Sequence, residues 1–316
     1  MICGVDVSKQ TLEVRVEQEG PGGSFANSQE GIAQLADFCR AQQVHLVAME
    51  ASGGYEKLPF ALLWAEQIAV TIVNPRAVRR FAEGMGYLEK TDALDAGVIA
   101  HFARTKKSKP CSPASAQEQH LRALVTRLRQ LTEVQTAQSN QRLLVTDSTV
   151  QELCQQMLTL VKKQIRRLEK AIAQLIGADP LWQQLDASFR TIKGVAGRTV
   201  SRLMAEMPEI GTLSHKRISK LAGLAPLAWD SGKAHGKRAV RGGRRPIRDT
   251  LFIVAGVVAR FNPDFMAFRQ RLTLAGKAKK VIRVALAHKL LIRLNAKARE
   301  VRQQFSQATV SSAIGA

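Results

Sequence analysis

The sequence has no long apolar run, which argues against a membrane-embedded protein. No stretch approaches the roughly 18 consecutive apolar residues of a transmembrane helix. The N-terminus also lacks the basic, apolar and small-residue order of a secretory signal peptide. We therefore expect a cytoplasmic protein.

Cysteine and aromatic residues are also scarce. The four cysteines, Cys3, Cys39, Cys111 and Cys154, are widely separated, with no CxxC spacing and no His cluster beside them. This pattern indicates neither a zinc site nor a disulfide framework, so we expect the thiols to fill the core. Aromatic side chains make up only 5% of the chain and form no base-reading motif, so the sequence does not identify a DNA target.

Positive charge, by contrast, is in large excess. The chain has 316 residues, enough for about two domains, and a formal net charge of +21. Residues 1–100 hold 8 Lys and Arg against 13 Asp and Glu, whereas residues 101–316 hold 39 against 13. The resulting +26 of the second segment exceeds what solubility requires. It indicates a polyanionic partner, bound largely through phosphate neutralisation.

The acidic first third of the chain predicts an α/β domain. Residues 2–7 are an apolar run and residues 11–17 alternate apolar and polar side chains, as two antiparallel strands do. Further strands are expected at 24–27, 44–49 and 68–73, and helices at 31–42, from about residue 54, and after Asn74-Pro75. The order of three strands, helix, strand, helix, strand, helix is that of a ribonuclease H-like mixed sheet.

Four acidic residues occupy the places where such a sheet carries acids. Asp6 lies in the first strand and Glu50 at the end of the fourth. Asp92 and Asp95 lie three residues apart, on one face of an expected helix. Close carboxylates suit a hard cation such as Mg²⁺, which would polarise a phosphodiester. Simpler explanations stay open: Thr91 and the two Asp could cap the helix, and Glu50 could be a surface or turn residue.

Residues 115–176 predict two long helices. Apolar residues recur about every 3.6 positions, and the break at Thr146-Asp147-Ser148 offers an N-cap. We expect the helices to be antiparallel and to end before Asp179-Pro180. Their apolar stripe is typical of a coiled-coil arm that self-associates.

A glycine-containing turn and a basic loop follow the arm. Residues 191–199 are similar to a helix-hairpin-helix turn, whose backbone N–H groups contact phosphate, although a plain interhelical turn explains the glycines equally well. Residues 231–248 hold seven Lys or Arg and no acid, which predicts a mobile loop that lets phosphate approach the backbone. A helix should start at Pro246, and cationic helices should continue to Gln303, before a polar tail.

Five short motifs occur in order along the chain. They are GVDVSK around Asp6, MEASGGYE around Glu50, KTDALDA around Asp92 and Asp95, GLAP, and DSG followed by GGRRPIR. With them the chain resembles the DEDD-type insertion-sequence transposases related to the Piv invertase, which are bridge-RNA-guided serine recombinases. The resemblance spans nearly the whole chain.

The resemblance implies a domain organisation and a set of site residues. It implies an α/β RuvC-like (ribonuclease H-like) catalytic domain at 1–108, a long helical coiled-coil arm at 109–180 and a mainly α-helical transposase domain at 181–316. The acids Asp6, Glu50, Asp92 and Asp95 would bind Mg²⁺, and Ser231 would attack DNA. Composition alone does not identify Ser231 as a nucleophile, because serine before glycine is ordinary in turns.

A serine nucleophile explains why two distant motifs are needed. A serine hydroxyl is a weak nucleophile at its free pKa. The only carboxylate beside Ser231 in the sequence is Asp230, so the metal site must activate the serine, within one chain or across a dimer. Covalent capture keeps the phosphodiester energy, so strands can be rejoined without ATP. The scissile strand would be held by the cations of the basic loop: Lys233, Lys237, Arg238, Arg241, Arg244, Arg245 and Arg248.

The resemblance also implies partners, and two other classes of function stay open. The partners are donor and target DNA, a structured guide RNA and further copies of the chain, as a dimer or as a tetramer in the active complex, in a bacterial cytoplasm. The first alternative is a Mg²⁺-dependent structure-specific nuclease of the Holliday-junction type, which leaves no protein attached to the DNA ends. The second is a non-catalytic nucleic-acid-binding protein, which cleaves nothing.

Overall fold

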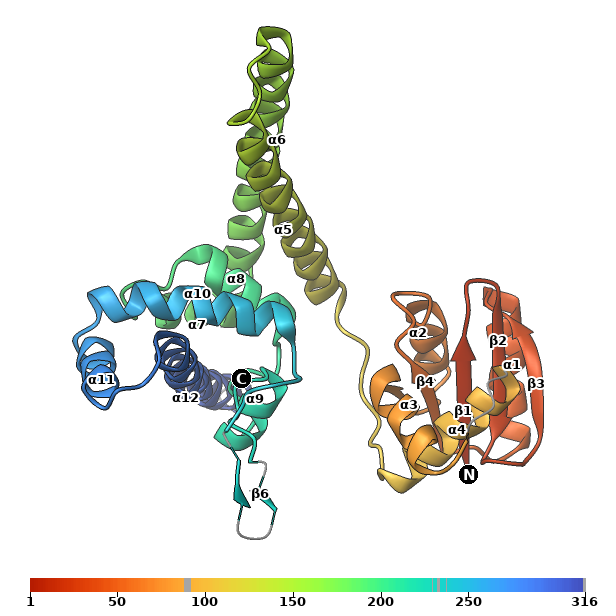
Figure 1. Ribbon diagram of the computed structural model, residues 1–316. Coiled ribbons are helices and arrows are strands. Elements are labelled where there is room, and N and C mark those ends of the chain that lie inside the picture. Colours follow the sequence, from red (N-terminus) through yellow and green to blue (C-terminus); the bar gives the residue numbers. More distant parts are fainter. Residues whose placement is uncertain (88–91, 229, 232–233, 237, 315–316) are drawn as a thin grey trace. The chain divides into compact units, whose positions relative to one another are not determined.

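The computed structural model describes residues 1–87, 92–228, 230–231, 234–236 and 238–314, and within these it omits the side chains of 92–94, 234–235 and 309–314. The chain forms two compact units, Met1–Ala114 and Ser115–Ala316 (Figure 1). The expected three-part division at residues 108 and 180 stays a prediction.

The N-terminal unit contains the expected mixed sheet. Its strands are β1 (Ile2–Val7), β2 (Thr11–Val16), β3 (Gly22–Ala26), β4 (Leu46–Glu50) and β5 (Val70–Val73), in the order β3-β2-β1-β4-β5. β1 is antiparallel to β2 and parallel to β4, and β4 is parallel to β5. The helices are α1 (Gln29–Ala41), α2 (Lys57–Ala65), α3 (Pro75–Gly84) and α4 (Asp92–Thr105). The predicted element order is confirmed.

Helices cover both faces of this sheet because both faces are apolar. Cys3 and Val5 of β1 belong to one buried cluster with Ile32 of α1 and Leu63 of α2. On the other face, Ile2 of β1 and Leu46 and Ala48 of β4 belong to a second cluster, which residues of α3 and α4 complete. Successive residues of a strand point to opposite faces, which produces this division.

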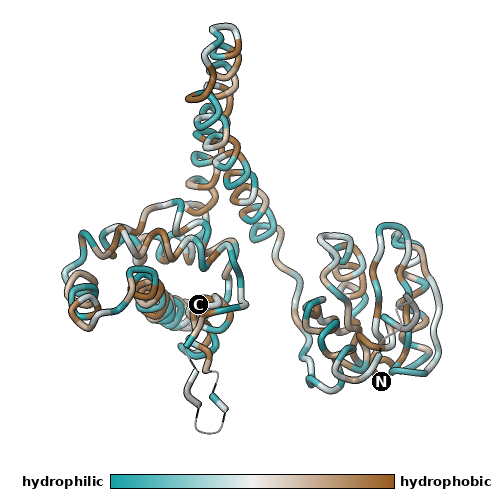
Figure 2. Tube along the Cα trace, viewed as in Figure 1, coloured by the Kyte–Doolittle hydropathy of each residue, from teal (hydrophilic) through white to brown (hydrophobic). Residues whose placement is uncertain are grey.

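The C-terminal unit begins with the two expected long helices. α5 (Ala116–Arg142) and α6 (Ser148–Ala178) pack against each other as a helical hairpin (Figures 1 and 2). Ser115 and Glu118 form a capping box at the start of α5, and the side chain of Asp147 caps α6 by accepting from Val150 N at 3.0 Å. The predicted break between the helices is confirmed.

The remaining elements form one core with the base of this hairpin. They are α7 (Pro180–Arg190), α8 (Gly197–Glu206), α9 (His215–Leu221), the short strands β6 (Asp230–Ser231) and β7 (Ala234–His235), α10 (Arg245–Phe261), α11 (Pro263–Leu274) and α12 (Lys279–Ile314). The expected polar tail after Gln303 is wrong, since α12 continues to Ile314; the Gln, Ala and Ser residues there tolerate a helix.

Two further expectations need correction. All four cysteines are free, but only Cys3 and Cys39 are buried; Cys154 is half-buried and Cys111 is exposed, so the thiols do not all fill the core. The basic segment, expected as a mobile loop, contains regular structure, because β6 and β7 pair within it as a short hairpin.

Within the described residues, no single helix is long and apolar enough to cross a membrane, although α10 and α11, bent by 102° at their junction, meet the length and composition criteria as a pair.

Candidate nuclease and strand-transfer sites

The strand register places Asp6 and Glu50 side by side at one edge of the N-terminal sheet. β1 and β4 are parallel neighbours, and the last pair in their register is Val5 opposite Met49. Asp6 and Glu50 are therefore the next pair, at the carboxyl ends of both strands. Because side chains alternate, both acids share the sheet face of Ala48, which is the face that α4 covers.

The direction of α4 brings Asp95 to the same edge. A Cβ on Gly4 would lie 1.9 Å from the carbonyl oxygen of Ala96, so the middle of α4 lies directly on β1. At the far end of α4, Arg104 pairs with Glu17 at 2.9 Å, and Glu17 accepts from the backbone N–H of Ile2. α4 thus runs antiparallel to β1, and its first turn lies over the end of β1 that carries Asp6.

The carboxylates at this edge are suited to a hard cation. Asp6, Glu50 and Asp95 are each half-buried, so a cation held there could keep some of its waters. The side chain of Asp92, at the start of α4, lies outside the described residues, as do Lys90 and Thr91. Among the side chains that are described, no three His, Cys, Asp or Glu lie close enough to hold a metal ion.

The turn after Glu50 is fixed by a residue that the sequence analysis did not single out. Glu56 Oε2 accepts from Ser52 N at 3.1 Å, Ser52 Oγ at 2.9 Å and Gly54 N at 2.8 Å. Partial burial raises the pKa of Glu56, but the hydrogen bonds from the turn outweigh it and lower that pKa overall. Gly53 and Gly54 have φ of 80° and 136°, which only glycine adopts readily. The two glycines shortly before Glu56 in SGGYE were therefore the sequence signal for this turn.

Ser231 lies exposed on a hairpin in the C-terminal unit. Asp230 holds the hairpin together, since its carboxylate accepts from Arg238 at 2.6 Å and from Gly236 N at 3.1 Å. The hydrogen bond from Arg238 lowers the pKa of Asp230. Asp230 is therefore a poor base for Ser231. At the root of the hairpin, Leu227 and Ala239 exchange backbone hydrogen bonds.

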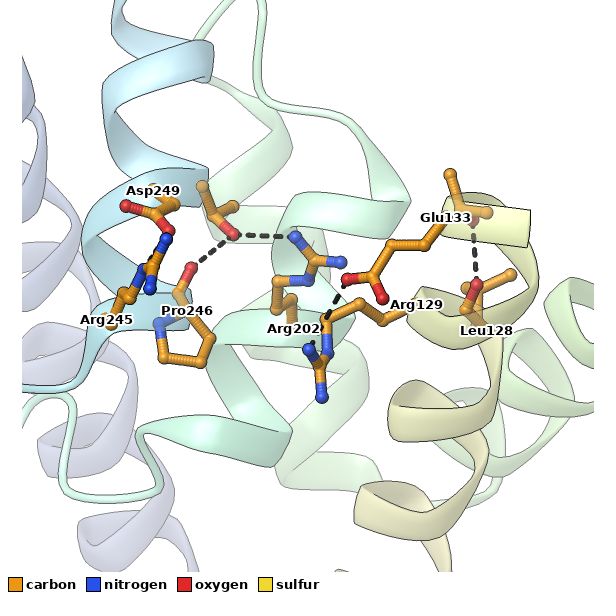
Figure 3. Close-up of polar contacts among 9 residues, drawn as sticks. Leu128, Arg129, Glu133, Arg202, Arg245, Pro246 and Asp249 are labelled. Atoms are coloured by element: carbon orange, nitrogen blue, oxygen red, sulfur yellow. Dashed lines mark hydrogen bonds and ion pairs between the residues drawn. The ribbon is translucent and has the colours of Figure 1, made fainter. Parts of the chain in front are cut away.

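The seven predicted cations differ in their surroundings. Lys233 and Lys237 lie outside the described residues. Arg238, Arg241 and Arg245 are exposed, and Arg245 makes only a loose i,i+4 pair with Asp249 at 3.3 Å (Figure 3). Arg248, half-buried, donates to the carbonyl of Gly242 at 2.5 Å.

Arg244 stands apart from this group because its guanidinium is engaged within the fold. It donates to both carboxylate oxygens of Glu209, at 2.6 and 2.5 Å, and to the carbonyl of Glu206 at 2.8 Å. Burial alone would raise the pKa of Glu209, but the hydrogen bond and charge of Arg244 outweigh it and lower that pKa. The side chain of Arg244 is therefore structural.

Backbone packing fixes the segment that follows the hairpin. The turn at Gly223 lies so close to Gly243 that a Cβ on Gly243 would lie 2.2 Å from Gly223 N. Thr250 on α10 donates to Pro246 O at 2.8 Å and accepts from Arg202 of α8 at 2.9 Å (Figure 3). Ser231 thus projects on a short hairpin from a rigid, cationic base.

Comparison with known protein families gives two matches. Residues 3–150 match the DEDD transposase model of the IS110 group, described as "Transposase", and residues 186–270 match "Transposase IS116/IS110/IS902 family". The first covers the acid edge, and the second covers the hairpin and the basic segment.

Individual relatives agree with these matches. The chain is 29% identical to the pilin gene-inverting proteins of Moraxella lacunata and Moraxella bovis, over 91% of this chain and 92% of theirs. It is 32% identical to an IS110 insertion element protein of Streptomyces coelicolor, over 38% of this chain and 29% of that one. Among solved structures, Thermus thermophilus RuvC matches 35% of this chain and 99% of its own, with 15% identity and a TM-score of 0.26. Since the two family models together reach into both compact units and the inverting proteins match most of the chain, this chain is a transposase, a DNA recombinase of the IS116/IS110/IS902 family.

Proposed function

We propose that this recombinase cuts, exchanges and rejoins DNA strands through a Mg²⁺-binding acid site in the N-terminal unit and a covalent phosphoserine intermediate at Ser231. The observation that carries the proposal is the convergence of Asp6, Glu50 and the first turn of α4 at one sheet edge. Carboxylates that lie near one another repel, and a bound divalent cation would offset that repulsion.

The acids have the role of holding the cation. Asp6, Glu50, Asp92 and Asp95 would supply its oxygen ligands, in keeping with the preference of Mg²⁺ for carboxylates and water. Bound Mg²⁺ would polarise the scissile phosphodiester and activate the attacking oxygen. The turn fixed by Glu56 would keep Glu50 at the end of its strand.

Ser231 has the role of nucleophile. Its Oγ would form a bond to phosphorus while the bond from phosphorus to the leaving deoxyribose oxygen breaks; the serine loses its proton and the leaving oxygen gains one. A deoxyribose hydroxyl of the other strand would then displace the serine, so the number of phosphodiester bonds is conserved. Because Asp230 is bound to Arg238, activation of the serine is assigned to the acid site.

The cations near Ser231 would hold the scissile strand. Arg238, Arg241, Arg245 and Arg248, together with Lys233 and Lys237, are suited to phosphate, whereas Arg244 is assigned a structural role. Cations placed at the reacting phosphate also offset the charge that develops during its transfer.

The partners of the reaction are also part of the proposal. We assign donor DNA, target DNA and a structured guide RNA to the basic C-terminal segment, whose net charge of +26 exceeds what solubility requires. In an RNA-guided reaction base pairing reads sequence, which fits a chain with 5% aromatic residues. The helical hairpin would serve as a coiled-coil arm that joins copies of the chain, in a bacterial cytoplasm, as a dimer or a tetramer.

Mass spectrometry of a stalled reaction tests the serine. On nicked DNA, the wild-type protein should yield a peptide with a nucleotide adduct on Ser231, whereas Ser231→Ala should bind DNA and lose both cleavage and joining. Asp6→Asn and Glu50→Gln should keep binding and lose cleavage. Free 5′-phosphate ends, and cleavage that persists in Ser231→Ala, would instead indicate a nuclease that uses water.

Ribonuclease treatment tests the guide RNA separately. Recombination at full rate after exhaustive digestion of copurifying RNA would disprove the RNA-guided part and leave the serine chemistry intact.

A further inference from the structure

A small pocket at the junction of α10, α11 and α12 lies apart from the basic loop. These three helices pack against one another at the end of the C-terminal unit (Figure 1). The pocket has a volume of 240 Å³, and its wall includes the side chains of Arg260, Arg269, Lys279 and Arg283. Its wall also includes the buried Ile282 and Leu286.

Among the described residues, the pocket has an excess of positive charge that no nearby acid neutralises. Among the described residues that line it there is no Asp or Glu. No ion pair joins any of the four cations to an acid within the described part of the chain. Four like charges around one small space repel one another, which costs free energy unless an anion joins them.

Arg283 is held in place without the help of a carboxylate. Its guanidinium lies over the ring of Phe252, with Cζ 5.2 Å from the ring centroid. It also lies against Gly256 of α10, so closely that a Cβ there would be 2.0 Å from Nη2. A glycine in the middle of a helix lowers helix stability. Its presence at position 256 indicates that the space it leaves for the guanidinium of Arg283 has a function.

The chemistry of the wall favours phosphate over other anions. α12 begins at Lys279, so the positive end of its helix dipole adds to the four cations. Among the described residues of the wall, the one hydroxyl is that of Thr273, and it already donates to the carbonyl of Arg269 at 2.9 Å. The exposed Lys277 and Lys280 extend the positive charge beyond the pocket.

We propose that this pocket binds a backbone phosphate of a polynucleotide, independently of base sequence and apart from the strand held near Ser231. The inference rests on the proposed function in one respect only, which is that the chain acts on nucleic acid. The polynucleotide is either the DNA substrate or the guide RNA, since both offer the same phosphodiester.

Salt-dependent binding of two probes tests the pocket. Arg269→Gln should lower the affinity of the full-length protein for duplex DNA, for single-stranded RNA, or for both. The slope of log K against log salt should become shallower by about 0.9 for one lost contact on duplex DNA and by about 0.7 on a single strand. Arg271→Gln is the matched control: it removes the same charge from the same helix, but Arg271 stacks on Phe268 outside the pocket.

Gly256→Ala tests the pocket without any change of charge. The added methyl group would displace the guanidinium of Arg283, which is the flexible end of a side chain, so the protein should fold with unchanged or higher helix stability. Binding should weaken in the same direction as in Arg269→Gln, and thermal unfolding checks the fold.

The outcomes separate the two nucleic acids and the two proposals. A change with DNA alone assigns the pocket to the substrate, and a change with RNA alone assigns it to the guide. If wild type binds both probes and Arg269→Gln and Gly256→Ala bind as Arg271→Gln does, the pocket assignment is wrong and the proposed function stands. If wild type binds neither probe, both are wrong.

Discussion

Arg244 and Arg245 are adjacent in the sequence but have different roles. Arg244 makes a two-point contact with the half-buried Glu209, whereas Arg245 is exposed and makes a loose pair with Asp249. Arg244→Gln should lower the free energy of unfolding by about 1–2 kcal/mol, since it leaves Glu209 without its partner in a partly solvated site. Arg245→Gln should change it by less than about 0.5 kcal/mol. Denaturant unfolding measures both, and equal losses would contradict the distinction.

The same ion pair predicts a pH dependence. The pKa of Glu209 is lowered in the folded protein, so the pair contributes stability above the ordinary pKa of 4.5 and loses it as pH falls through the lower, folded value. The stability difference between wild type and Arg244→Gln should therefore be full at neutral pH and shrink in acid below pH 4.5. A difference that is constant or grows in acid would show that the ion pair does not stabilise the fold.

Glu56 predicts a different effect, on the acid site rather than on overall stability. Its carboxylate oxygen Oε2 accepts three hydrogen bonds from the turn that follows Glu50, and the neutral amide oxygen of Gln would accept each of them more weakly. Glu56→Gln should raise the Mg²⁺ concentration needed for half-maximal cleavage and leave DNA binding unchanged. Glu66→Gln, which removes an exposed acid that pairs with Arg40, is the control. An unchanged Mg²⁺ dependence in Glu56→Gln would mean that the turn does not position Glu50.

At the scale of the element, α4 sets the geometry of the acid edge because it lies directly on β1. Gly4→Ala would place a methyl group against the backbone of α4, 1.9 Å from Ala96 O, and a backbone atom cannot move aside as a side chain does. The change should cost about 1–3 kcal/mol. Gly84→Ala, in α3, is the control: its Cβ would meet nothing within 4 Å and should be neutral or mildly stabilising. Thermal unfolding compares the two, and equal melting temperatures would show that α4 tolerates displacement.

The same elements show what the sequence could predict. A short apolar run predicted β1 and alternating apolar residues predicted β2, and the placement of Asp6 and Glu50 followed from the positions of the strands. The close contact of Gly4 with α4 depends on residues more than 90 positions apart, which no local pattern reports. The ion pair of Arg244 likewise depends on Glu209, 35 residues earlier. The sequence therefore predicted Arg244 as one of the phosphate-binding cations, although its side chain is structural.

At the scale of the whole molecule, the helical hairpin carries two apolar stripes. The inner one includes Val161 and Ile165 of α6, which are buried in the core of the unit. The outer one, near the tip, has a spacing of three, four and three residues and stays exposed: Val150, Leu153, Met157 and Leu160, with exposed fractions of 43 to 59%. Alternating steps of three and four residues are the spacing of a coiled-coil seam, so the outer stripe predicts that the arm pairs with a second copy of the chain.

Replacing a leucine of the outer stripe should therefore weaken self-association without unfolding the arm. Leu153→Gln changes a side chain that is 59% exposed, so the helix should keep its inner contacts and its melting temperature. Burying one leucine contributes about 1.5–3 kcal/mol, and both copies lose it, so dimer dissociation should increase at least tenfold. Analytical ultracentrifugation measures this against Leu274→Gln, which replaces a leucine that is 90% exposed at the end of α11. Wild-type protein that stays monomeric at every concentration, or equal association of the two variants, would mean that the outer stripe does not join copies of the chain.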